Sequence, residues 1–134
     1  MQVQPYLYFN GHCEEAMEFY RNAVGAKITT LTRFKDNPGA PAPADAGEKV
    51  MHAEIAIGDT SVLASDGQCS GATDFKGFSL SLTAAKNAEA DSLFAAFSDG
   101  GRVQVPLMST PFASRFGMVA DRFGVLWTIA AHEQ

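Results

Sequence analysis

The chain has 134 residues, of which 46% are hydrophobic and 19% charged; this ordinary globular composition over the length of about one domain excludes a disordered, collagen-like or low-complexity chain. Ten basic residues against fifteen acidic ones give a net charge of −5, which argues against a nucleic-acid partner because phosphate-binding surfaces are rich in Lys and Arg. No apolar stretch approaches the roughly 18 residues of a membrane span, and the first residues lack the basic and apolar regions of a signal peptide. We therefore expect a cytoplasmic protein without a membrane partner.

The first half of the chain predicts a strand, a helix and three further strands, at residues 3–9, 13–24, 27–34, 49–57 and 60–65. Pro5 lacks an amide hydrogen, which favours an edge position for the first strand. Apolar residues recur every three or four positions in the helix, and Gly25 ends it. Residues 35–47, rich in Pro, Ala and Gly, are predicted to form a surface loop.

The second half repeats this order. We predict a strand at 77–83, a helix that Asn87 caps and Gly100-Gly101 ends, and short strands near 102–106, 116–121 and 124–131. Gly25 and Gly101 are 101 − 25 = 76 residues apart. We infer an α+β fold, with a single domain, 1–134, made of two βαβββ modules, about 1–68 and about 76–134. Each module buries one sheet face under its helix and leaves the other face free to curl around a cavity.

Alternation along the strands predicts which side chains point to the free face. In strand 49–57 we expect Met51, Ala53, Ile55 and Ile57 in the core. The free face is then predicted to carry Gln4, Tyr6, Tyr8, Val50, His52, Glu54, Ala56, Ser79, Ser81, Leu126, Thr128 and Ala130.

His52 and Glu54 are the candidate catalytic residues, since they are two apart on one strand and share a face. This spacing suits either two ligands of a metal or a histidine whose tautomer is fixed by a carboxylate. Metal sites usually need three or four protein ligands, and the other free-face residues are weak ligands. We therefore favour a hydrogen-bonded or exposed pair and expect neither a metal nor a cofactor.

Tyr6 and Tyr8 are candidates for the wall of a ligand cavity, because such sites combine aromatic walls with a few polar groups; ordinary strand aromatics are an equal alternative. Arg115 suits either an anion clamp or a solvated loop position. Cys13 lies at a helix start, where the dipole can lower a thiol pKa, but a buried, inert thiol is the favoured interpretation. Phosphate-loop, dinucleotide-binding, H-E-x-x-H and nucleophile-elbow motifs are absent.

Three stretches carry a resemblance to a known family: PYLYFNG at 5–11 with EEAMEFY at 14–20, VMHAEI at 50–55 with ASD at 64–66, and FGMVADRFGVLW at 116–127. In this order they resemble PhnB-like proteins of the vicinal oxygen chelate superfamily, which includes glyoxalase I, bleomycin-resistance proteins, fosfomycin-resistance enzymes and extradiol dioxygenases. The resemblance implies paired βαβββ modules whose sheets form a cup, commonly in a homodimer.

The metal-using members of this superfamily place His, Glu or Gln ligands on the first and fourth strands of each module. Carried over, these positions fall near Gln4, near Leu63 or Ala64, near Gly77 or Ser79, and near Thr128. Gln4 can ligate, Ser79 and Thr128 are poor replacements, and Leu63 and Ala64 cannot ligate at all. The resemblance therefore implies that the inherited metal site is largely lost, and it transfers no chemical role to His52.

Three functions remain open. The first is binding of a small molecule in the cup, with recognition by Gln4, Tyr6, Tyr8, Ser79, Ser81, Arg115 and Thr128. The second is a metal-dependent isomerase, lyase or transferase on a small oxygen-rich or phosphonate-like substrate, with His52 as base or ligand, Glu54 orienting it and Gln4 assisting. The third is a dimer without a ligand. A ubiquinone-methyltransferase label sometimes given to PhnB-like proteins finds no support in these residues, since no glycine loop for a nucleotide follows a strand.

Overall fold

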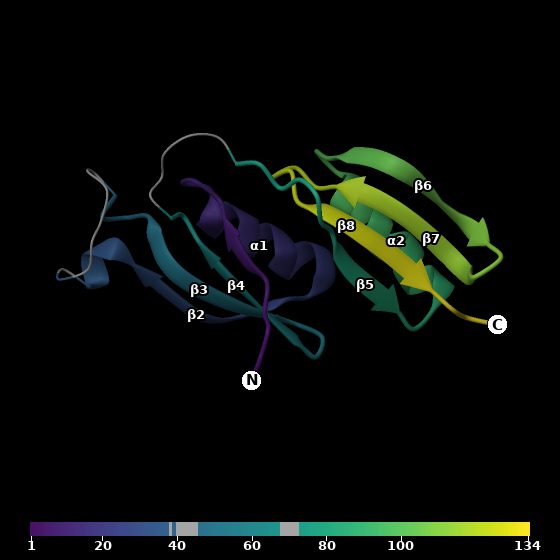
Figure 1. The fold of residues 1–134 in the computed structure, drawn as a ribbon, viewed down its shortest axis with the longest axis horizontal. Helices are drawn as coiled ribbons and strands as arrows, with labels where there is room; N and C mark the ends of the chain where they lie inside the picture. The colour runs from purple at the N-terminus through teal and green to yellow at the C-terminus, as the bar shows by residue number, and fades with distance from the viewer. Residues whose placement is uncertain (38, 40–45, 68–72) are drawn as a thin grey trace. The chain divides into compact units, whose positions relative to one another are not determined.

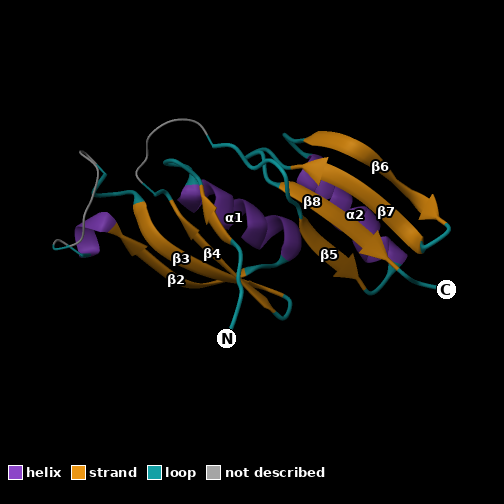
Figure 2. Cartoon of the chain, in the orientation of Figure 1, coloured by secondary structure: helices purple, strands orange, loops and turns teal. Residues whose placement is uncertain are grey.

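The computed structural model describes residues 1–37, 39, 46–67 and 73–134. The chain divides into two compact units, Met1–Thr73 and Asp74–Gln134, called unit 1 and unit 2 below. Each unit has one α-helix and one four-stranded sheet (Figures 1 and 2). The predicted α+β class and the βαβββ order of each half are confirmed.

Unit 1 contains β1 (Tyr6–Tyr8), α1 (Cys13–Val24), β2 (Lys27–Arg33), a short 3₁₀ helix (Phe34–Asp36), β3 (Val50–Ile57) and β4 (Thr60–Ser65). The strand order in its sheet is β1-β4-β3-β2. Strand β1 runs parallel to β4, and the other neighbours are antiparallel. The first strand is thus at an edge, as Pro5 predicted, and α1 ends at Gly25 in the left-handed conformation.

Unit 2 contains β5 (Leu80–Ala84), α2 (Asn87–Ser98), β6 (Arg102–Thr110), β7 (Ala113–Ala120) and β8 (Leu126–Ala131). Its strand order, β5-β8-β7-β6, is that of unit 1 with each strand replaced by its counterpart. The first strand again pairs in parallel with the last. The structural repeat inferred from the spacing of the two helices is therefore real, although the two sequences differ.

One helix covers one face of each sheet. In unit 1 the buried residues of α1 are Cys13, Ala16, Met17 and Tyr20, and the Tyr20 ring lies 6.4 Å from that of buried Phe9. In unit 2 the Phe97 ring of α2 stacks on Trp127 of β8 at 4.5 Å. Burial of these large apolar side chains is the main source of stability of each unit.

Several predicted boundaries need correction. Strand β1 begins at Tyr6 rather than at residue 3, and Val3 is almost fully exposed. Val50, expected on the free face, is buried, because the register of β2 against β3 shifts beside it, between Thr32 and Arg33. Strand β6 extends to Thr110, since Pro106 lies on an edge strand that tolerates a missing amide.

The cap of α2 also differs from the prediction. Asn87 is the first residue of the helix, and its amide donates to the Glu133 carboxylate at 2.8 Å. The Asn87 side-chain oxygen instead accepts a hydrogen bond from Ser114. In the part of the chain that the structure describes, no helix is long and apolar enough to cross a membrane.

Candidate functional site

The face of the unit 1 sheet opposite α1, called the open face below, carries the candidate residues of β1 and β3. Along β1, buried Leu7 alternates with Tyr6 and Tyr8, which are 38% and 54% exposed. Along β3, His52 and Glu54 are half-buried and alternate with the buried Ala53 and Ile55. The pattern of alternation therefore placed these four side chains correctly.

A hydrogen bond joins a side chain of β1 to one of β3 on this face. The Tyr6 hydroxyl lies 2.9 Å from Nδ1 of His52, and the two rings are 5.7 Å apart and tilted. Tyr6 also stacks on Tyr8, with ring centroids 5.0 Å apart and planes 16° apart. Tyr6, Tyr8 and His52 thus form one group of rings, called the tyrosine–histidine cluster below.

The electrostatics of the cluster favour a neutral phenol. Partial burial, with a smaller contribution from Tyr8, raises the pKa of the Tyr6 hydroxyl above its usual value. The Tyr6 hydroxyl can donate to Nδ1 of His52, an arrangement in which the imidazole carries its N–H at Nε2. In that arrangement the open face offers an N–H donor at His52 and an oxygen acceptor at Tyr6.

Glu54 is oriented by Thr29 rather than by His52. The Thr29 hydroxyl donates to the Glu54 carbonyl at 3.1 Å and approaches its carboxylate at 3.4 Å. Thr29 is the extra residue of a bulge between Ile28 and Thr30 on β2, which aims its side chain across to β3. The recorded partner of His52 Nδ1 is Tyr6, so the pairing of His52 with Glu54 that the two-residue spacing suggested is not what the structure shows.

Gln4 precedes β1, and its amide donates to the Ser61 carbonyl at 3.4 Å, a long hydrogen bond. The described residues contain no group of three or more His, Cys, Asp and Glu arranged to hold a metal ion. Gln4, Glu54 and His52 are therefore separate polar groups, each with its own protein partner.

The remaining candidates belong to unit 2. The hydroxyls of Ser79 and Thr128 are hydrogen-bonded at 2.9 Å, and exposed Ser81 is paired with Thr128 across β5 and β8. Arg115 lies within β7, not in a loop, and its guanidinium donates to the Asp91 carboxylate of α2 at 2.9 Å. Arg115 thus binds an anion of its own chain, on the helix side of the sheet.

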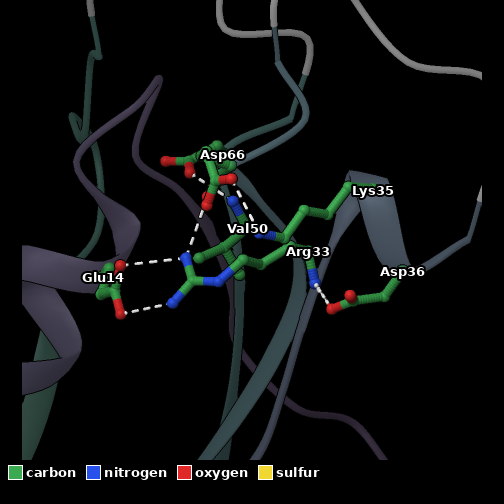
Figure 3. A network of polar contacts seen from close by, with 7 residues as sticks. Glu14, Arg33, Lys35, Asp36, Val50 and Asp66 are labelled. Carbon is green, nitrogen blue, oxygen red and sulfur yellow. Dashed lines mark hydrogen bonds and ion pairs between the residues drawn. The ribbon is translucent and has the colours of Figure 1, made fainter.

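A buried carboxylate that the alternation could not identify organises the start of α1. Asp66, directly after β4, accepts hydrogen bonds from the amides of Gly11, Cys13 and Val50 at 2.7–2.8 Å. Figure 3 shows Asp66 with Val50, and beside them the Arg33 guanidinium on both oxygens of Glu14. The sequence signal that could have identified Asp66 is the position of an acidic residue immediately after a buried strand.

The surroundings of Cys13 decide between the reactive and the inert interpretation of its thiol. The thiol is completely buried and free. Burial, together with the negative charges of Asp66 and Glu14, raises the pKa of Cys13 above its usual range. The lowered pKa considered from its place at a helix start is therefore wrong, and the thiol is inert.

Two mixed sheets, each built as βαβββ with one helix, define the glyoxalase/bleomycin-resistance fold. The fold is shared with the glyoxylase/bleomycin resistance protein/dioxygenase domain of Frankia sp. EAN1pec, with a TM-score of 0.67 at 13% identity over 100% of this chain and 93% of that one. The chain belongs to the family described as 3-demethylubiquinone-9 3-methyltransferase, the PhnB-like proteins, whose model matches residues 1–130.

Individual proteins are similar to this chain over its full length. Protein PA1353 of Pseudomonas aeruginosa is 39% identical, with a TM-score of 0.88 over 100% of this chain and 99% of its own. A PhnB protein from Bacillus cereus is 26% identical, with a TM-score of 0.82 over 98% and 99% of the two chains. Protein YjdN of Escherichia coli is 28% identical over 100% of this chain and 97% of its own. The family assignment made from the three motifs is therefore confirmed.

Proposed function

We propose that the protein binds a small organic molecule on the open face of unit 1, through the tyrosine–histidine cluster. The observation that carries the proposal is the stacked, exposed pair of Tyr6 and Tyr8, of which Tyr6 is hydrogen-bonded to His52. Aromatic side chains supply large contact areas at low entropic cost, and their hydroxyls fix the orientation of a ligand.

The polar groups around the cluster supply specificity. His52 Nε2 and the Tyr6 oxygen present a donor and an acceptor, and Glu54 adds a carboxylate that accepts from an N–H or O–H group. Gln4 contributes an amide beside β1. Unit 2 is proposed to have ligand contacts of its own, at the hydroxyls of Ser79, Ser81 and Thr128, whereas Arg115 is proposed to hold α2 against β7 through Asp91.

A ligand that prefers the folded protein raises its melting temperature. We expect at least one class of small aromatic or oxygen-rich compounds to raise the melting temperature of the wild-type protein, and the effect to be lost in Tyr6→Ala and in His52→Ala. The matched control is Phe112→Ala, which removes an aromatic ring that is 65% exposed in unit 2.

The control variant should respond to the compounds as the wild type does. Loss of about twofold to tenfold in affinity on removal of one ring corresponds to the 0.5–1.5 kcal/mol of an aromatic contact. Equal responses of the wild type and both open-face variants would contradict the proposal, as would a panel that shifts none of them.

A metal-dependent isomerase, lyase or transferase is the second candidate, because His52 and Glu54 lie on one face of β3 and Gln4 precedes β1 of the same sheet. In this case the purified protein contains a stoichiometric divalent metal that is lost on His52→Ala. Elemental analysis separates the two proposals directly, since a metal held by His52 favours the enzyme and a metal-free protein that binds its ligand favours the binder.

A further inference from the structure

Gly67 lies against Tyr8, the tyrosine of the cluster that is stacked on Tyr6. A Cβ atom added at this position would lie 3.1 Å from Cδ1 of Tyr8 and within 4 Å of its Cγ and Cβ. Such a separation is tighter than ordinary van der Waals contact between carbon atoms. The turn that brings Gly67 there is fixed by a hydrogen bond from its amide to the Ser65 hydroxyl, at 2.9 Å. The Tyr8 ring therefore occupies space that a side chain at position 67 would claim.

The contacts continue from Tyr8 to the polar end of the cluster. Tyr8 stacks on Tyr6 at 5.0 Å, and Tyr6 is hydrogen-bonded to His52 at 2.9 Å. Because Tyr8 is in ring contact with Tyr6 and a hydrogen bond weakens steeply with misalignment, we expect displacement of Tyr8 to change the geometry at His52. Gly67 thus lies at one end of a contact chain that runs through both tyrosines.

We propose that Gly67 is a specificity-determining residue: by leaving room for the Tyr8 ring, it keeps three rings in one continuous row and makes the open face selective for planar aromatic ligands. This inference rests on the proposed function, since it names the ligand class of the same surface. A flat conjugated molecule adds to such a row by stacking or edge-to-face contact, whereas a puckered saturated ring of equal size does not.

The chain offers a matched control for backbone strain. Gly67 and Gly58 have nearly equal φ angles, +59° and +57°, but a Cβ at Gly58 would meet nothing within 4 Å. An alanine at either position is held in the left-handed conformation, so the backbone strain of the two variants is matched. Only Gly67→Ala should displace Tyr8, so the difference between the two variants isolates the contact with the ring.

The first readout needs no ligand. The ring signals of His52 in NMR spectra, assigned by their loss in His52→Gln, should shift in Gly67→Ala and stay in place in Gly58→Ala. In a Tyr8→Ala background, Gly67→Ala should no longer move them. Unchanged signals in Gly67→Ala, or a shift that persists without the Tyr8 ring, overturn the positioning role.

If Gly67→Ala fails to fold, Tyr8→Leu supplies the second variant, because it removes the stacking ring and keeps Gly67. The His52 signals should then move as they do on loss of the ring in Tyr8→Ala. Signals that stay at their wild-type positions in both Tyr8 variants would show that no displacement is passed along the row.

The second readout uses 2-naphthol and its saturated counterpart 2-decalol as probes in calorimetry. We expect the wild type and Gly58→Ala to bind 2-naphthol about tenfold more tightly than 2-decalol, and Gly67→Ala to lose about threefold to tenfold of its affinity for 2-naphthol. Equal affinities for the two probes overturn the selectivity for planar ligands. If the His52 signals shift but neither probe binds, the positioning role of Gly67 stands. The proposed ligand class and the proposed binding site on the open face are then both contradicted.

Discussion

Asp66 is a single buried side chain that binds three backbone amides and caps α1. It is 1% exposed. Its two oxygens accept hydrogen bonds from the backbone amides of the turn before α1, of the first residue of α1 and of the start of β3. A buried carboxylate is tolerated only when its oxygens are hydrogen-bonded, and the N-terminus of a helix favours negative charge. His12, which precedes α1, provides no side-chain cap, so Asp66 performs that task.

We predict that Asp66→Ala lowers the free energy of unfolding by about 3–5 kcal/mol, because it leaves three buried amides without acceptors. Urea denaturation measures the change. Asp59→Ala, in an exposed turn, should stay within about 0.5 kcal/mol of the wild type. A loss at Asp66 no larger than at Asp59 would show that water replaces the carboxylate at these amides.

At the scale of elements, the pair of Glu14 and Arg33 ties α1 to β2. Both guanidinium nitrogens of Arg33 that face the helix bind the Glu14 carboxylate, at 2.7 and 3.0 Å. These hydrogen bonds hold the pKa of Glu14 below its usual value. A group whose pKa is lowered by folding stabilises the protein above its unfolded pKa, and this contribution is lost as the pH falls through the folded value.

We therefore expect Glu14→Gln to melt about 1–4 °C below the wild type at pH 7, a small effect because the carboxylate is largely exposed. The difference should disappear below the folded pKa of Glu14, where the wild-type carboxyl is protonated as well. In an Arg33→Gln background the substitution should have no effect at either pH. A constant difference from pH 7 to pH 3 would exclude the ion pair as its cause.

Elements whose signals are local could be predicted from the sequence, and contacts between distant residues could not. Alternation with period two places Tyr6 beside Tyr8 and His52 beside Glu54, because it depends only on neighbouring residues. The bond between Tyr6 and His52 spans 46 residues and requires β4 to lie between β1 and β3, an order that alternation does not contain. The same limit applies to Arg115, whose partner Asp91 is 24 residues away.

At the scale of the whole molecule, the two units repeat one design with different residues. In unit 2 the amide at the start of α2 is bound by Glu133, which follows the last strand as Asp66 follows β4. The two carboxylates differ in type and in their distance from the strand end, so comparison of the two halves residue by residue does not reveal the shared cap. Topology, set by strand order and helix position, is what both halves retain.

The resemblance to PhnB-like proteins also leads us to propose a homodimer in the cytoplasm. Large apolar side chains are exposed on unit 2, at Val103, Met108 and Phe112, and such groups favour association. Light scattering at micromolar concentrations should give about twice the 14.3 kDa of the chain. A mass that stays at the monomer value over that concentration range contradicts the dimer.

The parallel pairing of first and last strands has a consequence for synthesis on the ribosome. Cys13 emerges 53 residues before the Asp66 carboxylate that binds its amide, and Asn87 emerges 46 residues before Glu133. Strand β1 likewise has no neighbour until β4 is made, and β5 none until β8. Each unit is therefore completed only when its last strand leaves the ribosome, and a translational pause before that strand leaves the helix against a sheet in which the first strand is still unpaired and the last is missing.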